Sequence, residues 1–154
     1  ALINGQVEFT VASDAEKFQG EKQGQKTIID MAEFKVPFQF TCTVTTGKMI
    51  REQPDNVRRM VEALAAGVHY FKTNKEGSIR IFKKYMRGLS DEDLGAWLEE
   101  SRESLKPLPY PDDEGLRAEL EQINAPKLPG PEHYLNVSFL DELKKSGFVD
   151  KLYK

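Results

Sequence analysis

The chain has 154 residues, of which 39% are hydrophobic and 31% charged, a composition that excludes an intrinsically disordered protein. Its 22 basic and 25 acidic side chains give a net charge of −3, so the sequence has no basic excess for binding nucleic acid. No apolar run reaches the ~20 residues of a membrane span. The single cysteine, Cys42, excludes an internal disulfide, and its apolar surroundings predict a small buried residue rather than a catalytic nucleophile.

The first residues have the pattern of a junction inside a domain. The chain begins with Ala1 instead of methionine, and residues 1–6 resemble the last turn of a helix that stops at Asn4-Gly5. Residues 7–11 then have the composition of a short strand. Because a helix that leads into a strand is typical of the interior of an α/β domain, we expect the chain to be the C-terminal part of a larger protein.

The next residues, up to about position 50, alternate between helical and strand patterns. A helix is expected over 13–23, with Ser13 or Asp14 as its N-cap. Two further strands are expected over 27–29 and 38–45, where β-branched and aromatic residues recur. Three short strands leave open edges, so we expect them to pair with strands of an N-terminal half or with another chain.

Helical patterns dominate from Pro54 onward, so we expect half of the chain or more to be helical. Apolar residues recur every three or four positions over 54–74 and predict one buried helix face: Val57, Met60, Val61, Leu64, Val68 and Phe71. A second helix is expected over 74–87, opened by a capping box of Thr73 and Glu76.

Three more helices are expected towards the C-terminus. A capping box of Ser90 and Asp93 opens one that carries Trp97, which we expect to pack against neighbouring helices. Another is expected over 112–124. The last, over 139–146, is capped by Ser138 and ends at Gly147 in the left-handed conformation.

Residue spacing alone assembles no catalytic or metal centre. His69 and His133 are the only histidines, and neither has ligand-type residues at a useful spacing, apart from Glu132 beside His133. The glycines are isolated, without the glycine-rich loop that holds phosphates. The acidic clusters at 91–93 and 112–114 both stand at helix starts, where the helix dipole explains them more simply than acid–base catalysis does.

Three stretches nevertheless follow one another in the order and spacing of a known family. They are Ala1-Leu2-Ile3-Asn4-Gly5-Gln6-Val7-Glu8; residues 45–55 with 57–71 and 73–76; and Gly115-Leu116 with 134–136, 139–140 and 146–148. Together they resemble the substrate-binding proteins of bacterial ABC importers, of the nitrate, taurine and aliphatic-sulfonate class, which overlaps with binders of thiamine-pyrimidine precursors. One departure is Glu8, which stands where the family usually has aspartate.

The resemblance implies an α/β fold of the type II periplasmic-binding-protein kind, in which ligand is trapped between two lobes. Residues 1–12 would end the second lobe and cross back, and residues 13–154 would form the C-terminal part of the first lobe, with a short-stranded sheet and a helix-rich C-terminal region. The implied partners are a small-molecule ligand, the importer's permease and the N-terminal half of the same protein. The implied location is the periplasm or the cell envelope, with no cofactor, metal or nucleic acid.

The resemblance also implies four ligand-binding residues. Ser13 and Asp14 match a loop of the family that faces the ligand cleft, and Thr45 and Thr46 match a second segment close to it. Each pair has a structural alternative, because Ser13 is equally suited to cap a helix and the two threonines to end a strand.

Two other functions stay open at this point. Thiamine-pyrimidine synthases resemble these binders, but they carry a cysteine-rich motif and use an internal histidine, whereas this chain has Cys42 alone and no histidine before His69. A ligand-sensing domain with the same fold is the other alternative. The ligand itself, among sulfonates, nitrate, taurine and pyrimidines, is not identified by these residues.

Overall fold

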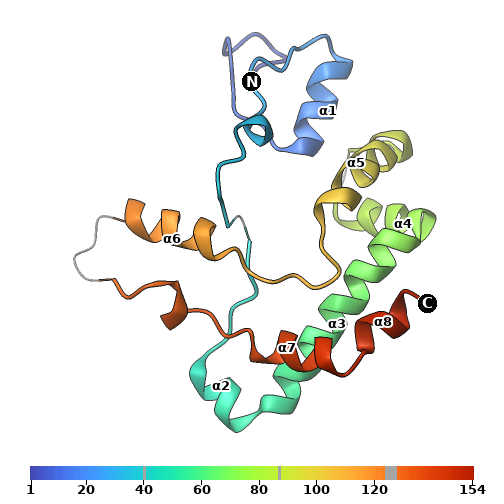
Figure 1. The fold of residues 1–154 in the computed structure, drawn as a ribbon. Coiled ribbons are helices and arrows are strands. Elements are labelled where there is room, and N and C mark those ends of the chain that lie inside the picture. Colours follow the sequence, from blue (N-terminus) through green and yellow to red (C-terminus); the bar gives the residue numbers. More distant parts are fainter. Residues whose placement is uncertain (40, 87, 124–127) are drawn as a thin grey trace. The chain divides into compact units, whose positions relative to one another are not determined.

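A computed structural model describes the chain except residues 40, 87 and 124–127 and the side chains of residues 14, 15 and 32 (Figure 1). Helices make up about 60% of the chain, as expected. In chain order they are α1 (Asp14–Lys22), the 3₁₀ helix η1 (Met31–Phe34), α2 (Gly47–Glu52), α3 (Pro54–Thr73), α4 (Lys75–Tyr85), α5 (Asp91–Ser104), α6 (Asp113–Gln122), the 3₁₀ helix η2 (Pro131–His133), α7 (Ser138–Lys145) and α8 (Phe148–Leu152). No helix in these described ranges is long and apolar enough to cross a membrane.

The chain folds as two compact units. Unit 1 comprises Ala1–Asp30 and Tyr70–Leu105, and unit 2 comprises Met31–His69 and Lys106–Lys154. Helix α3 therefore contributes its first part to unit 2 and its last turn to unit 1. Each unit has its own buried residues, and we describe each by itself.

In unit 1, α5 is the central helix, because it packs against both α1 and α4. Its residues Leu94 and Leu98 are 1% and 0% exposed. Trp97 lies edge-on to Phe82 and Phe71, with ring centroids 4.9 and 6.1 Å away, which confirms that it packs against neighbouring helices. These interlocked rings and leucines form the core of unit 1.

The start of α5 is held by the predicted capping box. The backbone N–H of Asp93 donates to Ser90 Oγ at 3.1 Å, and the backbone N–H of Ser90 donates to Asp93 Oδ2 at the same distance. Lys22 at the end of α1 lies 2.5 Å from Asp93 Oδ1. The Lys22 ammonium and the Ser90 donors lower the pKa of Asp93 from 3.8 to about 2.

Stability of unit 1 is expected to fall in acid through Asp93. Because the pKa of this carboxyl is lower in the folded chain, its contribution is complete above about pH 4 and is lost as pH falls towards 2. The urea concentration at the midpoint of unfolding should be higher for the wild type than for Asp93→Asn. This difference should be constant near neutral pH and should disappear between pH 4 and 2. Glu92→Gln is the control, because it changes a neighbouring side chain that is 86% exposed. This variant should lose stability between pH 4 and 2 as the wild type does. If it does not, the acid-dependent loss of stability does not come from Asp93.

The ends of α3 and α5 satisfy each other within unit 1. The Lys72 ammonium donates to the carbonyl oxygens of Arg102 and Leu105, at 2.5 and 2.7 Å. In return the Arg102 guanidinium donates to the carbonyl oxygen of Lys72, through Nε at 2.8 Å and through Nη2. Helix ends leave carbonyl groups without intrahelical partners, and here two cations supply the missing donors.

In unit 2, Ala65 of α3, Leu108 and Leu143 of α7 form the buried cluster. Five half-buried residues pack against it: Val61, Tyr110, Leu140, Phe148 and Val149. Gly147 has a φ of +68°, which turns the chain between α7 and α8, so its predicted left-handed conformation is confirmed. Phe148 packs on the cluster as the first residue of α8, a helix that the sequence did not predict.

The predicted apolar face of α3 is buried only in part. Phe71 is 9% exposed, whereas Met60 is 50% exposed and the other four residues of the stripe are half-buried. Two cap assignments are also wrong. Asn74, not Thr73, caps α4 by accepting from the N–H of Gly77 at 2.8 Å, and Asn136 accepts from the N–H of Ser138, which is already inside α7.

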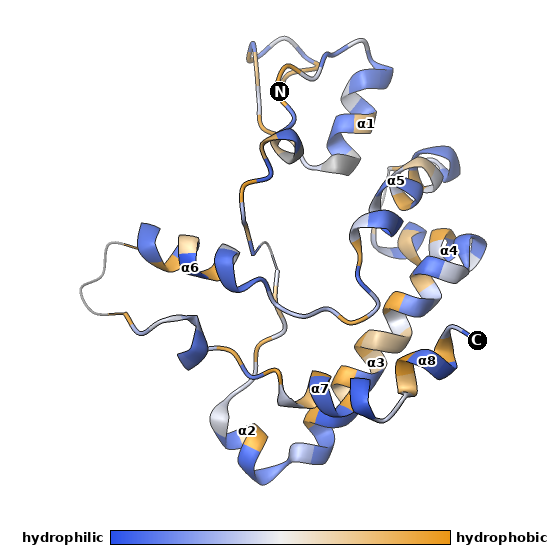
Figure 2. Ribbon diagram, in the orientation of Figure 1, coloured by the Kyte–Doolittle hydropathy of each residue, from blue (hydrophilic) through white to orange (hydrophobic). Residues whose placement is uncertain are grey.

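The predicted short-stranded sheet is not confirmed. In the described residues the segments 7–11, 27–29 and 38–45 contain no strand, and apart from the half-buried Gln39 the described residues of these segments are exposed. Their apolar side chains face solvent, as Phe9 at 77%, Ile28 at 82% and Val44 at 82% exposed illustrate, and Cys42 is exposed, contrary to expectation. Figure 2 shows hydrophobic residues along these extended segments as well as in the helices. A strand forms only when another strand satisfies its backbone, and none does so here.

Candidate functional site

Ser13 stands at the N-cap of α1, in unit 1. Its backbone is extended, with φ −83° and ψ 168°, which confirms its predicted capping position. Both its backbone N–H and its hydroxyl donate to Glu16 Oε2, at 2.9 and 3.0 Å, and these bonds lower the pKa of Glu16. Asp14 is the first residue of α1, but its side chain lies outside the described part of the chain.

Thr46 stands at the N-cap of α2, in unit 2. Its side-chain oxygen accepts a hydrogen bond from the backbone N–H of Met49 at 3.1 Å. Thr45 precedes it in extended, exposed chain. The threonines therefore lead into a helix instead of ending a strand. The sequence signal for this helix is a threonine, Thr46, at the N-cap position, three residues before Met49, whose amide it caps.

The described candidates share a chemical character. Ser13, Thr45 and Thr46 are exposed, and each hydroxyl can both donate and accept hydrogen bonds, as a polar or anionic ligand requires. At Ser13 the carboxylate of Glu16 already occupies the hydroxyl donor, so an anionic ligand there would have to replace Glu16. Ser13 and Asp14 are neighbours in unit 1, and Thr45 and Thr46 are neighbours in unit 2.

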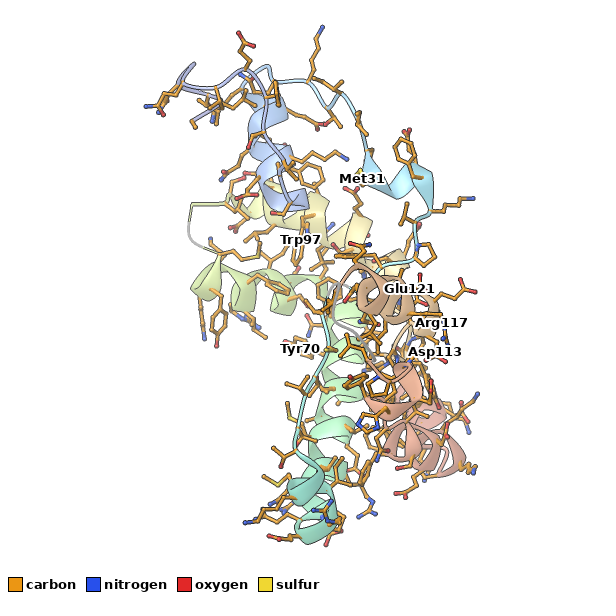
Figure 3. The ribbon with its side chains drawn as sticks, turned by 90° about the vertical axis from the view of Figure 1, so that its left-hand side faces the viewer. Met31, Tyr70, Trp97, Asp113, Arg117 and Glu121 are labelled. Carbon is orange, nitrogen blue, oxygen red and sulfur yellow. The ribbon has the colours of Figure 1, made fainter. Side chains whose placement is uncertain are left out.

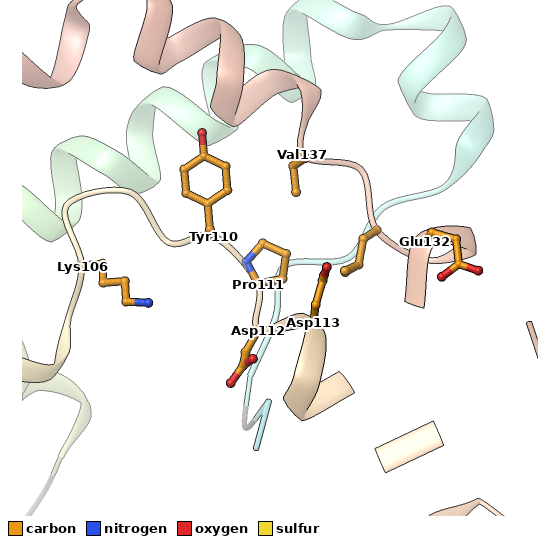
Figure 4. Close-up of a pocket in the computed structure, with 8 residues that line it drawn as sticks. Lys106, Tyr110, Pro111, Asp112, Asp113, Glu132 and Val137 are labelled. Carbon is orange, nitrogen blue, oxygen red and sulfur yellow. The ribbon is translucent and has the colours of Figure 1, made fainter. Parts of the chain in front are cut away.

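A hollow of about 650 Å³ in unit 2 was not predicted from the sequence (Figure 4). Its apolar lining comes from Pro111, Leu135 and Val137, and its charged lining includes Lys106, Asp113 and Glu132. Residues 106–113 and 131–137 lie far apart in the sequence, and η2 packs against α6 to bring the two segments together. No local sequence pattern predicts that these two segments lie together. Asp112, which also lines the hollow, caps α6 by accepting from the N–H of Glu114 at 3.1 Å.

The two histidines have aromatic neighbours. His69 lies edge-on to Tyr153 with ring centroids 4.7 Å apart, and His133 lies edge-on to Tyr134 at 5.2 Å. In the part of the chain that the structure describes, no group of three histidine, cysteine, aspartate or glutamate side chains is placed to hold a metal ion.

Comparison with known proteins identifies one family. The family model described as NMT1/THI5 like matches residues 1–78, which is half of the chain. The matched residues include Ser13, Asp14, Thr45 and Thr46 and end inside α4. No curated protein and no solved structure gives a significant match.

Proposed function

Because the chain belongs to the NMT1/THI5-like family, we propose that it is part of the solute-binding component of a bacterial ABC importer. The proposed ligand is a small polar or anionic molecule, such as a sulfonate, nitrate, taurine or a pyrimidine. The observation that carries this proposal is the family match over residues 1–78, since it spans all four residues that we assign to the ligand.

The proposed contacts are hydrogen bonds from exposed side chains. Ser13 Oγ would exchange its bond to Glu16 for one to a ligand oxygen, and the Thr45 and Thr46 hydroxyls would serve as further donors. Asp14 would accept from a ligand N–H or hydroxyl group. In the proposed protein the ligand is held between two lobes, residues 1–12 belonging to one lobe and residues 13–154, with the four assigned residues, to the other.

The proposed partners are the importer's permease and the remaining half of the solute-binding protein, in the periplasm or at the cell envelope. Exposed apolar residues support the second partner. Val7, Phe9 and Val11 alternate with more polar residues and are 41%, 77% and 97% exposed, as in a strand that lacks its neighbour. Strands of the remaining half would cover this surface and complete the sheet expected from the sequence.

We expect ligand binding to depend on Ser13. Taurine, short aliphatic sulfonates, nitrate and pyrimidines would be titrated calorimetrically into the chain together with its remaining half. Ser13→Ala should raise the Kd of the bound ligand about 3- to 10-fold, since one hydrogen bond contributes about 0.5–1.5 kcal/mol. Ser90→Ala is the control, because it removes a hydroxyl at another helix N-cap that lies outside the matched residues.

The outcomes test separately the role of Ser13 in the ligand site and the solute-binding function itself. Equal Kd values for Ser13→Ala and Ser90→Ala would remove Ser13 from the ligand site, and binding of none of these solutes would contradict the solute-binding function. Binding of equal strength by the 154-residue chain alone would contradict the need for the remaining half.

We further propose that the protein is not an enzyme. This rests on Cys42, which is the single cysteine and lies in exposed chain, and on the position of His69 beside Tyr153. Neither residue belongs to a cysteine-rich motif of the kind that thiamine-pyrimidine synthases carry. Recovery of the solute unchanged after prolonged incubation is expected, and a changed solute would favour the enzyme.

A further inference from the structure

We propose that one exposed face of α4, in unit 1, docks on a lipid surface that carries negative charge. This outer face consists of Arg80, Ile81, Lys84 and Tyr85. It lies beyond the residues that the family match covers, and the proposal is independent of the solute proposed above. It rests on two cations that the fold leaves without partners and on the exposed apolar side chains beside them.

The opposite side of α4 is occupied by α5. Trp97 of α5 packs its ring edge-on against a phenylalanine of α4, with ring centroids 4.9 Å apart. The ammonium group of Lys75 lies 2.8 Å from the Glu99 carboxylate of α5. The ammonium group of Lys83 lies 2.5 Å from the Asp91 carboxylate at the start of the same helix. The cations on this side of α4 are therefore neutralised within unit 1.

The outer face of α4 has no such partners. Helical spacing places its residues on the side away from α5, in two neighbouring rows of i and i+4. Arg80 and Lys84 form one row; both are exposed, and in the described part of the chain neither side chain makes an ion pair or a hydrogen bond. Ile81 and Tyr85 form the other row and are 43% and 80% exposed.

Tyr70, from the last turn of α3, extends the apolar row. A Cβ atom built on Gly77 would collide with Tyr70 Oη, so the phenol group lies against α4 at that glycine, one turn before Ile81. Tyr70 is still 38% exposed. Figure 3 shows Tyr70 and Trp97 on opposite sides of α4, Trp97 on the side of α5. Exposed apolar side chains thus follow the helix from Gly77 to its end, with a tyrosine at either end of the row.

An anionic lipid surface fits both rows. Its phosphate groups accept hydrogen bonds from Arg80 and Lys84, and its headgroup region takes up tyrosine, whose ring is apolar and whose hydroxyl stays in water. A protein partner fits less well, because a stable protein interface uses about 20–30 residues on each side, far more than this face offers. A missing strand does not fit either, since α4 is a complete helix whose backbone needs no neighbour.

The net charge of −3 of the whole chain does not oppose this docking. Residues 75–85 contain four basic side chains and a single acidic one, Glu76, so the helix itself is positive. At physiological ionic strength the Debye length is about 8 Å, so lipid phosphates interact mainly with the charges nearest to them. On the outer face those charges are Arg80 and Lys84.

The test measures co-sedimentation of the full chain with lipid vesicles at low salt. Vesicles of phosphatidylcholine alone are compared with vesicles in which about one third of the lipid is phosphatidylglycerol. The chain should bind the anionic vesicles and not the neutral ones, and ~0.5 M salt should release it. Arg80→Gln combined with Lys84→Gln should weaken binding at least ~10-fold, since each cation near an anionic surface accounts for about 5-fold. Tyr85→Ser should weaken binding about 3- to 10-fold through lost apolar contact.

Lys144→Gln combined with Lys145→Gln is the matched control. These exposed lysines belong to α7 in unit 2, and their removal changes the total charge by the same amount. The control should bind anionic vesicles as the wild type does, and circular dichroism should show all variants folded. Equal weakening in both double variants, equal binding to neutral vesicles, or no binding to anionic vesicles would each overturn the proposal. Binding of polyglutamate through Arg80 and Lys84, without binding of vesicles, would assign the face to an acidic protein and overturn it as well.

Discussion

Replacing Leu98 with aspartate is expected to unfold unit 1. Leu98 is 0% exposed and belongs to α5, the helix that packs against both α1 and α4. The substitution would place an unpaired carboxylate where no water reaches it, which costs more than a small domain can lose. Far-UV circular dichroism should lose helical signal, and urea unfolding should lose the transition of this unit.

A graded variant and a control make this test specific. Leu98→Ala keeps the site apolar and should lower the free energy of unfolding by about 2–5 kcal/mol, through lost burial and the cavity left behind. Ala96→Asp introduces the same charge on the exposed face of α5 and should cost at most about 0.7 kcal/mol from helix propensity. Retention of the wild-type spectrum and urea midpoint by Leu98→Asp would contradict the assignment of α5 as the centre of the unit.

Gly115→Ala is expected to separate α6 from the extended segment that crosses it in unit 2. A Cβ atom at Gly115 would lie 2.7 Å from the backbone N of Gln39 and 2.8 Å from the carbonyl carbon of Phe38. The same crossing is held by two hydrogen bonds: the N–H of Gln39 donates to Glu119 Oε1 at 2.9 Å, and Gln39 Oε1 accepts from the N–H of Asp112 at 2.7 Å. Because backbone atoms cannot yield as a flexible side chain does, both bonds should be lost.

The expected loss is about 1–3 kcal/mol of unfolding free energy, the usual cost of overfilling a packed contact. Gly67→Ala in α3 is the matched control, since no atom lies within 4 Å of a Cβ built there. It should stabilise the chain by up to about 1 kcal/mol, because glycine is the poorer helix former. Opposite signs of the two changes in urea unfolding would support the close crossing, and the same sign would contradict it.

The helices could be predicted because their signals are local. Ser90 and Asp93 are three residues apart, and the box that they form in the structure is the one that their spacing predicts. Gly147 likewise predicts its left-handed turn by residue type alone. Where two neighbouring residues compete for one role, as Thr73 and Asn74 do, the sequence does not decide which side chain reaches the amide.

The strands and the hollow depend on distant residues and so were not predictable in the same way. Segment 38–45 has the composition of a strand, but a strand requires a neighbour that supplies backbone partners, and composition does not provide one. The hollow depends on residues 106–113 and 131–137 lining the same space, which no periodicity in the sequence predicts. Of the candidate site, the capping role of Ser13 was predictable, whereas the helix capped by Thr46 was obscured by its β-branched neighbours.

The reciprocal hydrogen bonds of Lys72 and Arg102 tie the C-terminal ends of α3 and α5 to each other. Lys72 holds the last carbonyl groups of α5, and its own carbonyl oxygen is held by Arg102. Shortening Lys72 removes the donor to the last carbonyl groups of α5, and shortening Arg102 removes the donor to the Lys72 carbonyl oxygen at the end of α3. Because both side chains lie where the same two helix ends meet, a double-mutant cycle is expected to show coupling between the two losses.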